Sequence, residues 1–256
     1  MAFIRGKFAC VAGGVSGLGF ELSKALITDG LKGLLIADVN EKDASKAIND
    51  LKSYGETEIK FAKVDLANMY QTECMLKTMV DKFKHVDILI NSAGIVAESN
   101  YEHAVQVNYV SLLYATMLSL YKYMPKYKSG TEGVVVNIAS TFGIQPGYSL
   151  PVYTATKHAV VGIGRAFGNN YYYNRYKVRI LTMCPGYTPT SLTTAHDVDF
   201  DVNLFQKEIK NYLSQNGTSY GNCLKEMLAN PQNGAVWVTE GTEIYQYPIE
   251  NTFIRS

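Results

Sequence analysis

The sequence is poor in several features that would mark a specialised class of protein. Its 256 residues include four cysteines, which are far apart and form no C-x-x-C pair. This pattern argues against a disulfide framework and favours a reducing compartment. No apolar run reaches the roughly 18 residues needed to cross a bilayer, and the N-terminus shows no signal-peptide pattern. We therefore predict a cytoplasmic protein without membrane insertion.

An excess of charge of one sign is also missing. The 24 basic and 23 acidic residues nearly cancel, which leaves no strong field to attract nucleic acid or an anionic membrane. The four histidines show no metal-ligand spacing, and neither H-E-x-x-H nor the nucleophile elbow G-x-S-x-G occurs. We therefore predict no nucleic-acid partner, no metal and no acyl-transfer chemistry.

The sequence does contain a regular alternation of short apolar runs and helical patterns. Apolar runs without polar alternation suit strands buried on both faces, as in a parallel sheet covered by helices. Repeated strand–helix units predict a single α/β domain over residues 1–256, with a doubly wound parallel sheet of about seven strands. A looser part, residues 187–228, is interpreted as a substrate-binding loop region with two short helices. The predicted strands are residues 8–12, 34–36, 59–64, 87–91, 133–139, 178–183 and 235–239.

A glycine-rich turn separates the first predicted strand from the first predicted helix. Glycine permits positive φ and lets the backbone approach a pyrophosphate, which the positive end of the helix attracts. A purely structural turn is the alternative, but the position directly after the first buried strand favours a dinucleotide site. The residues predicted to form it are Gly13, Val15, Ser16, Gly17, Leu18 and Gly19.

Asp38 ends the second predicted strand, about twenty residues after the glycines. An acidic residue at this place bonds the adenosine ribose hydroxyls. Its charge would repel a 2′-phosphate, and Val15 and Val39 offer no compensating positive charge, so we predict NAD rather than NADP. Asp65, followed by Leu66, ends the third strand; it is placed either at the adenine edge or as a cap of the next helix.

Tyr153 and Lys157 lie four positions apart on one predicted helix face. A free tyrosine has a pKa of about 10, and a base near neutral pH needs it lowered by roughly three units. A Lys ammonium one turn away, together with a cationic oxidised nicotinamide nearby, can lower it in this way. We expect both side chains at the nicotinamide end of the cofactor, with Lys157 holding the ribose. Tyr173 and Lys177 share the spacing, but Tyr173 stands in a Tyr-Tyr-Tyr run at the far end of that helix, and we interpret it as structural.

The place of Tyr153 and Lys157 in the predicted fold favours them over the second pair as the catalytic residues. Tyr153 follows a loop after the strand that ends at Ser140, and strand ends are where open α/β sheets place ligands. The Ser140 hydroxyl is placed to bond the substrate oxygen. Asn108, in a long predicted helix over residues 101–127, is interpreted either as a water-holding link from Lys157 to solvent or as an ordinary helical asparagine. After the sixth strand, a loop predicted to contact nicotinamide contains Pro185, Gly186, Thr188 and Thr190.

Taken in order, the glycine turn, the Asn-Ser-Ala-Gly stretch at 91–94, Asn108, Ser140 and the Tyr-Thr-Ala-Thr-Lys motif resemble the short-chain dehydrogenase/reductase family over nearly the whole chain. The resemblance implies a Rossmann-type fold with strand order 3-2-1-4-5-6-7, an Asn–Ser–Tyr–Lys tetrad, and a homodimer or homotetramer. It also implies cofactor contacts from Asn91, Ala93 and Gly94. Ser92 departs from the family's usual asparagine.

Two segments resemble particular groups within the family. Residues 233–242 are similar to insect alcohol dehydrogenases, and residues 133–162 to NAD-dependent 15-hydroxyprostaglandin dehydrogenases. The resemblance implies a dehydrogenase that interconverts a secondary or primary alcohol and its ketone or aldehyde, with Tyr153 as base. The alternatives are an NADPH-dependent carbonyl reductase and a non-catalytic NAD-binding storage or regulatory protein. Apolar residues in 187–228 favour an apolar alcohol, and they suit a subunit interface equally well.

Overall fold

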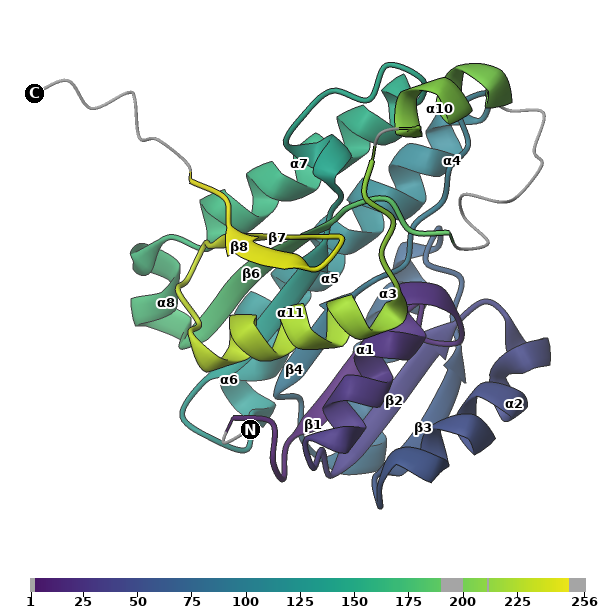
Figure 1. Cartoon of the computed structure of the whole chain (residues 1–256). Helices are drawn as coiled ribbons and strands as arrows, with labels where there is room; N and C mark the ends of the chain where they lie inside the picture. The colour runs from purple at the N-terminus through teal and green to yellow at the C-terminus, as the bar shows by residue number, and fades with distance from the viewer. Residues whose placement is uncertain (1–2, 190–199, 211, 249–256) are drawn as a thin grey trace, which may run out of the picture.

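A single eight-stranded sheet forms the centre of the computed structural model, which describes residues 3–189, 200–210 and 212–248 (Figure 1). The strand order is β3-β2-β1-β4-β5-β6-β7-β8, and the first seven strands are parallel. The fold is therefore the predicted Rossmann-type α/β arrangement. The parallel strands are β1 (Phe8–Ala12), β2 (Gly33–Asp38), β3 (Glu58–Lys63), β4 (Ile88–Asn91), β5 (Gly133–Ile138), β6 (Val178–Pro185) and β7 (Val236–Glu240).

The eighth strand was not predicted from the sequence. β8 (Glu243–Gln246) pairs antiparallel with β7 at the sheet edge, where Glu240 lies opposite Glu243. The two-residue connection contains Gly241 at φ 59°, a conformation that tight hairpins require. Because β8 has one partner strand and is mostly exposed, its sequence lacks the apolar run that marks the interior strands.

Helices cover both faces of the sheet. Side chains of β1 alternate between the two cores: Val11 contributes to one, and Cys10 to the other. The first core is closed by α1 (Gly17–Thr28), α2 (Glu41–Leu51) and α11 (Gly217–Ala229), which lie in front of the sheet in Figure 1. The opposite face is closed by α3 (Met69–Phe83), α5 (Ser111–Leu118) and α7 (Pro151–Phe167).

The long helix predicted over residues 101–127 is interrupted twice by π-helical turns. α4 (Tyr101–Val105), α5 and α6 (Met124–Tyr127) are joined through the turns Gln106–Val110 and Ser119–Tyr123. The first π turn contains Asn108. Such turns are frequent at functional sites.

The α-helices not yet described, α8 (Asn170–Tyr176) and α10 (Val202–Ile209), follow α7 in the chain. α7 ends at Phe167, and Tyr173 belongs to a separate helix, α8, so our placement of Tyr173 on the same helix as Tyr153 was wrong. Within 187–228, α10 and α11 are the two predicted short helices. Among the described residues, no helix is long and apolar enough to cross a membrane.

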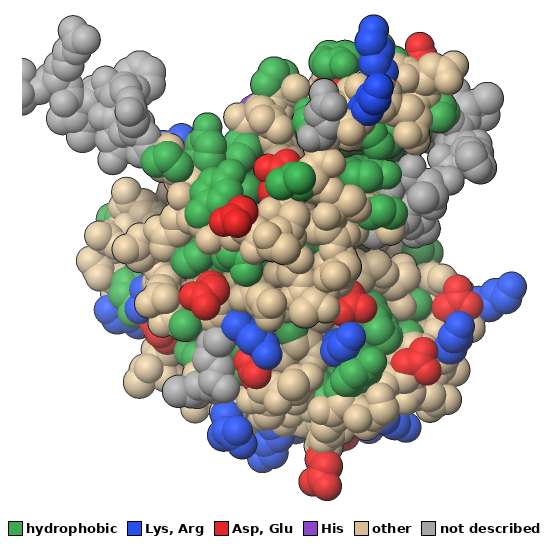
Figure 2. Space-filling model, in the orientation of Figure 1, with side chains coloured by type: hydrophobic (Ala, Val, Ile, Leu, Met, Phe, Trp, Pro, Cys, Tyr) green, Lys and Arg blue, Asp and Glu red, His purple; other side chains and the backbone are tan. Residues whose placement is uncertain are grey.

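The surface agrees with the near-neutral composition. On the face shown in Figure 2, the basic and acidic side chains of the described residues are interspersed, and apolar side chains gather around the upper part near α10. Several charges of the described residues are paired, including Lys225 with Asp29 at 3.3 Å and Lys63 with Glu41 at 2.9 Å. Exposed pairs of this kind add little to stability, and they leave no single-sign field on this face.

Candidate active site

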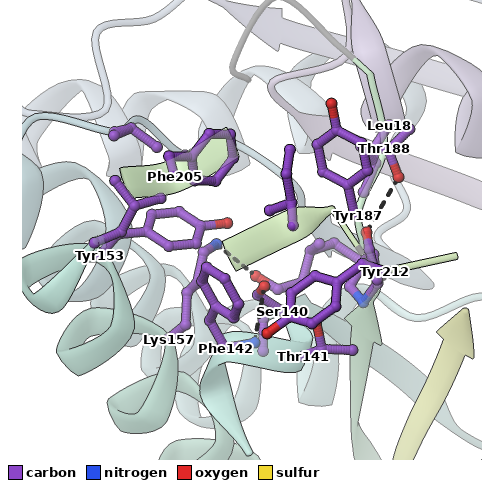
Figure 3. Close-up of a pocket in the computed structure, with 18 of the residues that line it drawn as sticks. Leu18, Ser140, Thr141, Phe142, Tyr153, Lys157, Tyr187, Thr188, Phe205 and Tyr212 are labelled. Carbon is purple, nitrogen blue, oxygen red and sulfur yellow. Dashed lines mark hydrogen bonds between the residues drawn. The ribbon is translucent and has the colours of Figure 1, made fainter. Parts of the chain in front are cut away.

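Two neighbouring cavities lie where the carboxyl ends of the parallel strands meet. The first, which we call the glycine-loop cavity, is lined by the turn after β1, the ends of β2 and β3, and the segment after β4. The second, the tyrosine cavity, is lined by residues after β4, β5 and β6 together with α7 and α10 (Figure 3). Leu18, Ser92 and Gly94 line both, so the two spaces are adjacent.

The glycine-loop cavity collects most of the residues predicted to hold the adenosine half of a dinucleotide. Of the residues predicted for the cofactor site, Val15 and Asn91 line neither cavity, and Thr190 lies outside the described residues. Val15 acts through its backbone amide, as described below. The Asn91 side chain is buried in the sheet, where it donates to Asn137 at 2.8 Å. The predicted residues that line it are Gly13, Ser16, Gly17, Leu18, Gly19, Asp38, Val39, Asp65, Leu66, Ala93 and Gly94.

Close packing explains why the turn requires glycine. Gly13 and Gly17 have positive φ angles of 79° and 55°. A Cβ on Gly19 would lie 2.0 Å from the Gly13 carbonyl oxygen, and a Cβ on Gly13 would lie 2.7 Å from the Cα of Ala93. The turn therefore folds back onto the start of α1 and against the segment after β4, and it presents bare backbone to the cavity.

Asp38 is held in place by the backbone on both sides of the cavity. One carboxylate oxygen accepts from the Val15 amide at 3.1 Å, and the other accepts from the Asn40 amide at 3.0 Å. Asp65 is bonded differently, since its carboxylate accepts from the Ala67 amide at 2.9 Å at the turn before α3. Asp38 is thus tied to the glycine turn itself, whereas Asp65 makes a local turn contact; the cap of α3 is Asn68, whose side chain accepts from the Tyr70 and Gln71 amides.

The junction between the cavities carries an unusual buried hydroxyl. Within the described part of the chain, the side-chain oxygen of Ser92 is buried without a hydrogen-bond partner. Next to it, a Cβ on Gly94 would lie 3.3 Å from Nζ of Lys157. A buried hydroxyl without a partner costs free energy, so a polar group of a bound molecule would find a favourable position here.

Tyr153, Ser140 and Lys157 converge on the tyrosine cavity. Tyr153 and Lys157 are buried on α7, with 9% and 3% of their surfaces exposed. Both side chains point toward Ser140 at the end of β5 (Figure 3). The Ser140 hydroxyl acts to lower the pKa of Tyr153 and accepts from the Phe142 amide at 3.1 Å. The predicted catalytic side chains thus face one space.

Burial controls the ionisation of both groups on α7. It raises the pKa of Tyr153 to about 12, although the Ser140 hydrogen bond acts to lower it. Burial also lowers the pKa of Lys157 to about 8. The ammonium donates to the Ile138 carbonyl at 3.0 Å and lies 5.4 Å from the Tyr153 ring centroid. The protein groups alone therefore do not lower the pKa of Tyr153, because loss of solvation outweighs the effect of Ser140. The expected lowering also included the positive charge of an oxidised nicotinamide.

Asn108 is engaged by protein groups. Its side-chain oxygen accepts from the Ile95 amide at 2.8 Å, and its amide group donates to the Ile95 carbonyl at 2.8 Å and to the Thr156 hydroxyl at 3.2 Å. Both of its N–H donors are used, so the side chain is instead a clamp between the segment after β4 and α7. The water-holding role that we considered for it would have to use its remaining acceptor capacity or its backbone.

The loop after β6 forms another wall of the tyrosine cavity. Pro185, Gly186 and Thr188 line it as predicted, whereas Thr190 lies outside the described residues. Two residues of the 187–228 region hold this loop. Gln215 donates to the Gly186 carbonyl at 3.2 Å, and the Tyr220 hydroxyl hydrogen-bonds the Thr188 hydroxyl. Sequence reasoning missed both, since neither belongs to a motif.

The second tyrosine–lysine pair has a different environment. The Tyr173 hydroxyl donates to Glu132 at 2.9 Å and accepts from Arg179 at 3.1 Å. Lys177 ends α8 in the left-handed conformation, with φ 53°. These contacts join α8 to the starts of β5 and β6, away from the carboxyl ends of the strands, which agrees with a structural role.

Two glutamates near the site were also missed. Glu98, after β4, accepts from the amides of Val152 and Tyr153, and Glu208, on α10, accepts from the amides of Tyr148 and Ser149. Both carboxylates act on the start of α7 or on the loop before it. The sequence signal that points to such partners is the Leu-Pro start of α7, which contains no capping side chain.

The fold and the site together define a Rossmann-type oxidoreductase. Residues 7–199 match the profile of the short chain dehydrogenase family. The chain belongs to this family.

The chain is similar to two groups of named relatives. Alcohol dehydrogenase 1 of Ceratitis cosyra is 32% identical over 247 residues, covering 93% of this chain and 94% of that protein. The 15-hydroxyprostaglandin dehydrogenase [NAD(+)] of Rattus norvegicus is 34% identical over 190 residues, covering 74% and 71%. The crystal structure of levodione reductase superposes with a TM-score of 0.78 at 23% identity, covering 93% of this chain and 96% of that one, which supports the fold.

Proposed function

We propose that the protein is an NAD-dependent dehydrogenase that interconverts an alcohol and its ketone or aldehyde, with Tyr153 as the general base. The observation that carries the proposal is the convergence of Tyr153, Ser140 and Lys157 on a buried cavity that adjoins the glycine-loop cavity. A proton-transfer group is thereby placed next to the space that fits a dinucleotide.

The residues of the glycine-loop cavity fit NAD. The bare glycine backbone suits a pyrophosphate, and the carboxylate of Asp38 suits ribose hydroxyls. The buried Ser92 hydroxyl suits a polar group of the cofactor. NAD is also the cofactor in the name of the similar protein from Rattus norvegicus. When bound, NAD supplies the hydride acceptor of the reaction.

The protein groups supply the proton chemistry and the orientation. The Ser140 hydroxyl holds the alcohol oxygen, and Tyr153 removes its proton. To accept the proton, Tyr153 must be a phenolate, and the ammonium of Lys157 stabilises that phenolate. The positive charge of an oxidised nicotinamide would act in the same direction. Asn108 keeps the segment after β4 against α7, so that the cofactor and the base keep their relative positions.

The lining of the tyrosine cavity favours an uncharged, apolar alcohol, secondary or primary. The space between its walls, including the part open to solvent, is about 840 Å³. Lys157 contributes the only charged side chain among the described lining residues. Away from the catalytic groups, the walls are formed by Val96, Phe142, Leu150, Tyr187, Phe200, Phe205, Ile209 and Tyr212. Several of these belong to the 187–228 region, which supports its role in substrate binding.

A screen of alcohols with NAD tests the proposed function. We expect NADH formation with uncharged secondary alcohols that carry medium or long apolar chains. Short alcohols, isoprenoid alcohols, steroids and prostaglandins form the rest of the screen. Tyr173→Phe, purified in the same way as the wild type, is screened beside it as a control, and we expect the two proteins to have the same activity. If no alcohol in the screen supports NADH formation, and no ketone or aldehyde supports NADH oxidation, the proposal is wrong.

Replacing Asp38 by Ala should weaken the preference for NAD over NADP. The variant loses the ribose acceptor and the charge that repels a 2′-phosphate, and contacts to charged groups are worth about 1.5–3 kcal/mol, or roughly tenfold to a hundredfold in the preference. The ratio of kcat/KM values for the two cofactors measures this change. Asp50→Ala, an exposed acidic position on α2, controls for net charge. A wild-type protein that already prefers NADP would contradict the assignment.

The proposed enzyme is further expected to be a cytoplasmic homodimer or homotetramer. This expectation comes from the family resemblance and from the cysteine and charge patterns of the sequence. Light scattering of the purified protein measures the mass directly, and a monomeric mass would contradict the expected assembly.

A further inference from the structure

The helix that carries Tyr153 begins without a capping group of its own. α7 starts at Pro151, which has no N–H, and the side chain of its N-cap residue Leu150 accepts no hydrogen bond. Its first turn contains no acidic residue. The start of a helix leaves amide groups that need an acceptor, so the acceptor must come from elsewhere in the chain.

Glu98 provides that acceptor. One of its carboxylate oxygens accepts from the Val152 amide at 2.8 Å, and the other accepts from the Tyr153 amide at 2.9 Å. The next amide, of Thr154, already bonds the Leu150 carbonyl at 2.9 Å. A single half-buried carboxylate therefore satisfies both free amides of the first turn, and its charge complements the positive end of the helix.

Glu98 belongs to a segment that touches both cavities. Residues 94–98, which we call the bridging segment, line the glycine-loop cavity through Gly94 and Ile95 and the tyrosine cavity through Gly94 and Val96. Asn108 clamps both backbone polar atoms of Ile95. The bridging segment thus runs from the expected cofactor site to the amide of Tyr153, with its middle fixed by Asn108 and its end fixed by Glu98.

We infer that Glu98 is a positioning residue: its two-point contact fixes the first turn of α7, and with it the Tyr153 hydroxyl, relative to the cofactor site. The inference rests on the proposed function. The preceding loop has its own anchor, because Glu208 accepts from the amides of Tyr148 and Ser149 at 2.9 and 3.0 Å. Loss of Glu98 therefore shifts the first turn and leaves the helix folded.

Three substitutions of Glu98 separate position from charge. Glu98→Ala should lower kcat by about tenfold to a hundredfold, the scale of a misplaced catalytic group, with NADH affinity and the KM for NAD little changed. Glu98→Asp keeps the charge but is too short to reach both amides, and should lose nearly as much. Glu98→Gln keeps the length and one acceptor oxygen, and should recover much of kcat. Glu102→Ala is the matched control, since Glu102 is an exposed glutamate on α4 whose carboxylate accepts from the Tyr101 hydroxyl.

The outcomes of this series are distinct. If the wild type itself shows no alcohol-dependent NAD reduction, the proposed function fails and the positioning role fails with it. If the wild type is active and Glu98→Ala keeps its kcat, or Glu98→Asp equals the wild type, only the positioning role is overturned. Should Glu98→Ala not fold, the remaining pair decides: kcat of Glu98→Gln above that of Glu98→Asp supports the inference, and the reverse order overturns it.

Discussion

Replacing Tyr153 by Phe should remove nearly all turnover while NADH still binds. The substitution deletes only the hydroxyl, and the phenyl ring keeps its buried position against the wall of the tyrosine cavity. General acid–base groups contribute about a hundredfold to ten-thousandfold, so kcat should fall by roughly a thousandfold or more. NADH binding, measured by fluorescence titration, should stay near the wild-type value, because the glycine-loop cavity is unchanged.

Tyr173→Phe is the matched control for this experiment. It makes the same chemical change in the other tyrosine–lysine pair, where the hydroxyl bonds Glu132 and Arg179. We expect a loss of stability of about 1 kcal/mol, typical of a lost hydrogen bond, and a wild-type kcat. If Tyr153→Phe kept substantial turnover, the assigned base would be wrong, and if Tyr173→Phe lost turnover, the choice between the pairs would be wrong.

Local patterns predicted the frame of this site. The interior strands follow from apolar runs that alternate with helical patterns, because a strand buried on both faces must be apolar throughout. Their order came from the family resemblance. The glycine turn follows equally directly, since Gly13 and Gly17 adopt positive φ and Gly19 has no room for a Cβ. These features depend on short stretches of chain, and a sequence displays them in order.

The contacts that hold the catalytic helix could not be predicted in this way. Glu98 and Tyr153 are 55 positions apart, and Glu208 and Ser149 are 59 apart. Nothing local distinguishes these glutamates from exposed ones such as Glu102, and only the packing of the chain brings them to free amides. The π turn at Asn108 was missed for a related reason, because a π turn leaves the helical pattern of side chains almost unchanged.

The ionisation states were also beyond the sequence. Spacing suggested that Lys157 lowers the pKa of Tyr153, but the depth of the cavity decides the direction for the protein alone. Burial raises the pKa of the phenol and lowers that of the ammonium, so each group resists its charged form. Burial therefore disfavours both the phenolate of Tyr153 and the ammonium of Lys157. A bound positive charge would lower the pKa of Tyr153 and favour its phenolate.

Replacing Lys157 by Met should abolish activity and, at the same time, stabilise the protein without cofactor. The methionine keeps an apolar chain of similar length but lacks the ammonium. Because burial lowers the pKa of Lys157 from 10.5 to about 8, holding the charged form costs on the order of 3 kcal/mol. The substitution also leaves the Ile138 carbonyl without its donor, which costs about 1–2 kcal/mol. The net gain should be about 1–2 kcal/mol, a rise of a few degrees in Tm.

The pH dependence of this gain provides the decisive measurement. Between the folded pKa of about 8 and the unfolded value of 10.5, the unfolded chain binds more protons than the folded protein, so the stability of the wild type rises with pH. The advantage of Lys157→Met should therefore be largest below about pH 8, and it should reverse to a small deficit before the pH reaches 10.5, because the desolvation cost disappears while the lost Ile138 contact remains. Urea unfolding of both proteins at about pH 7 and about pH 10 measures it. A variant that is less stable at neutral pH, or a difference independent of pH, would show that the ammonium is not held against a desolvation cost.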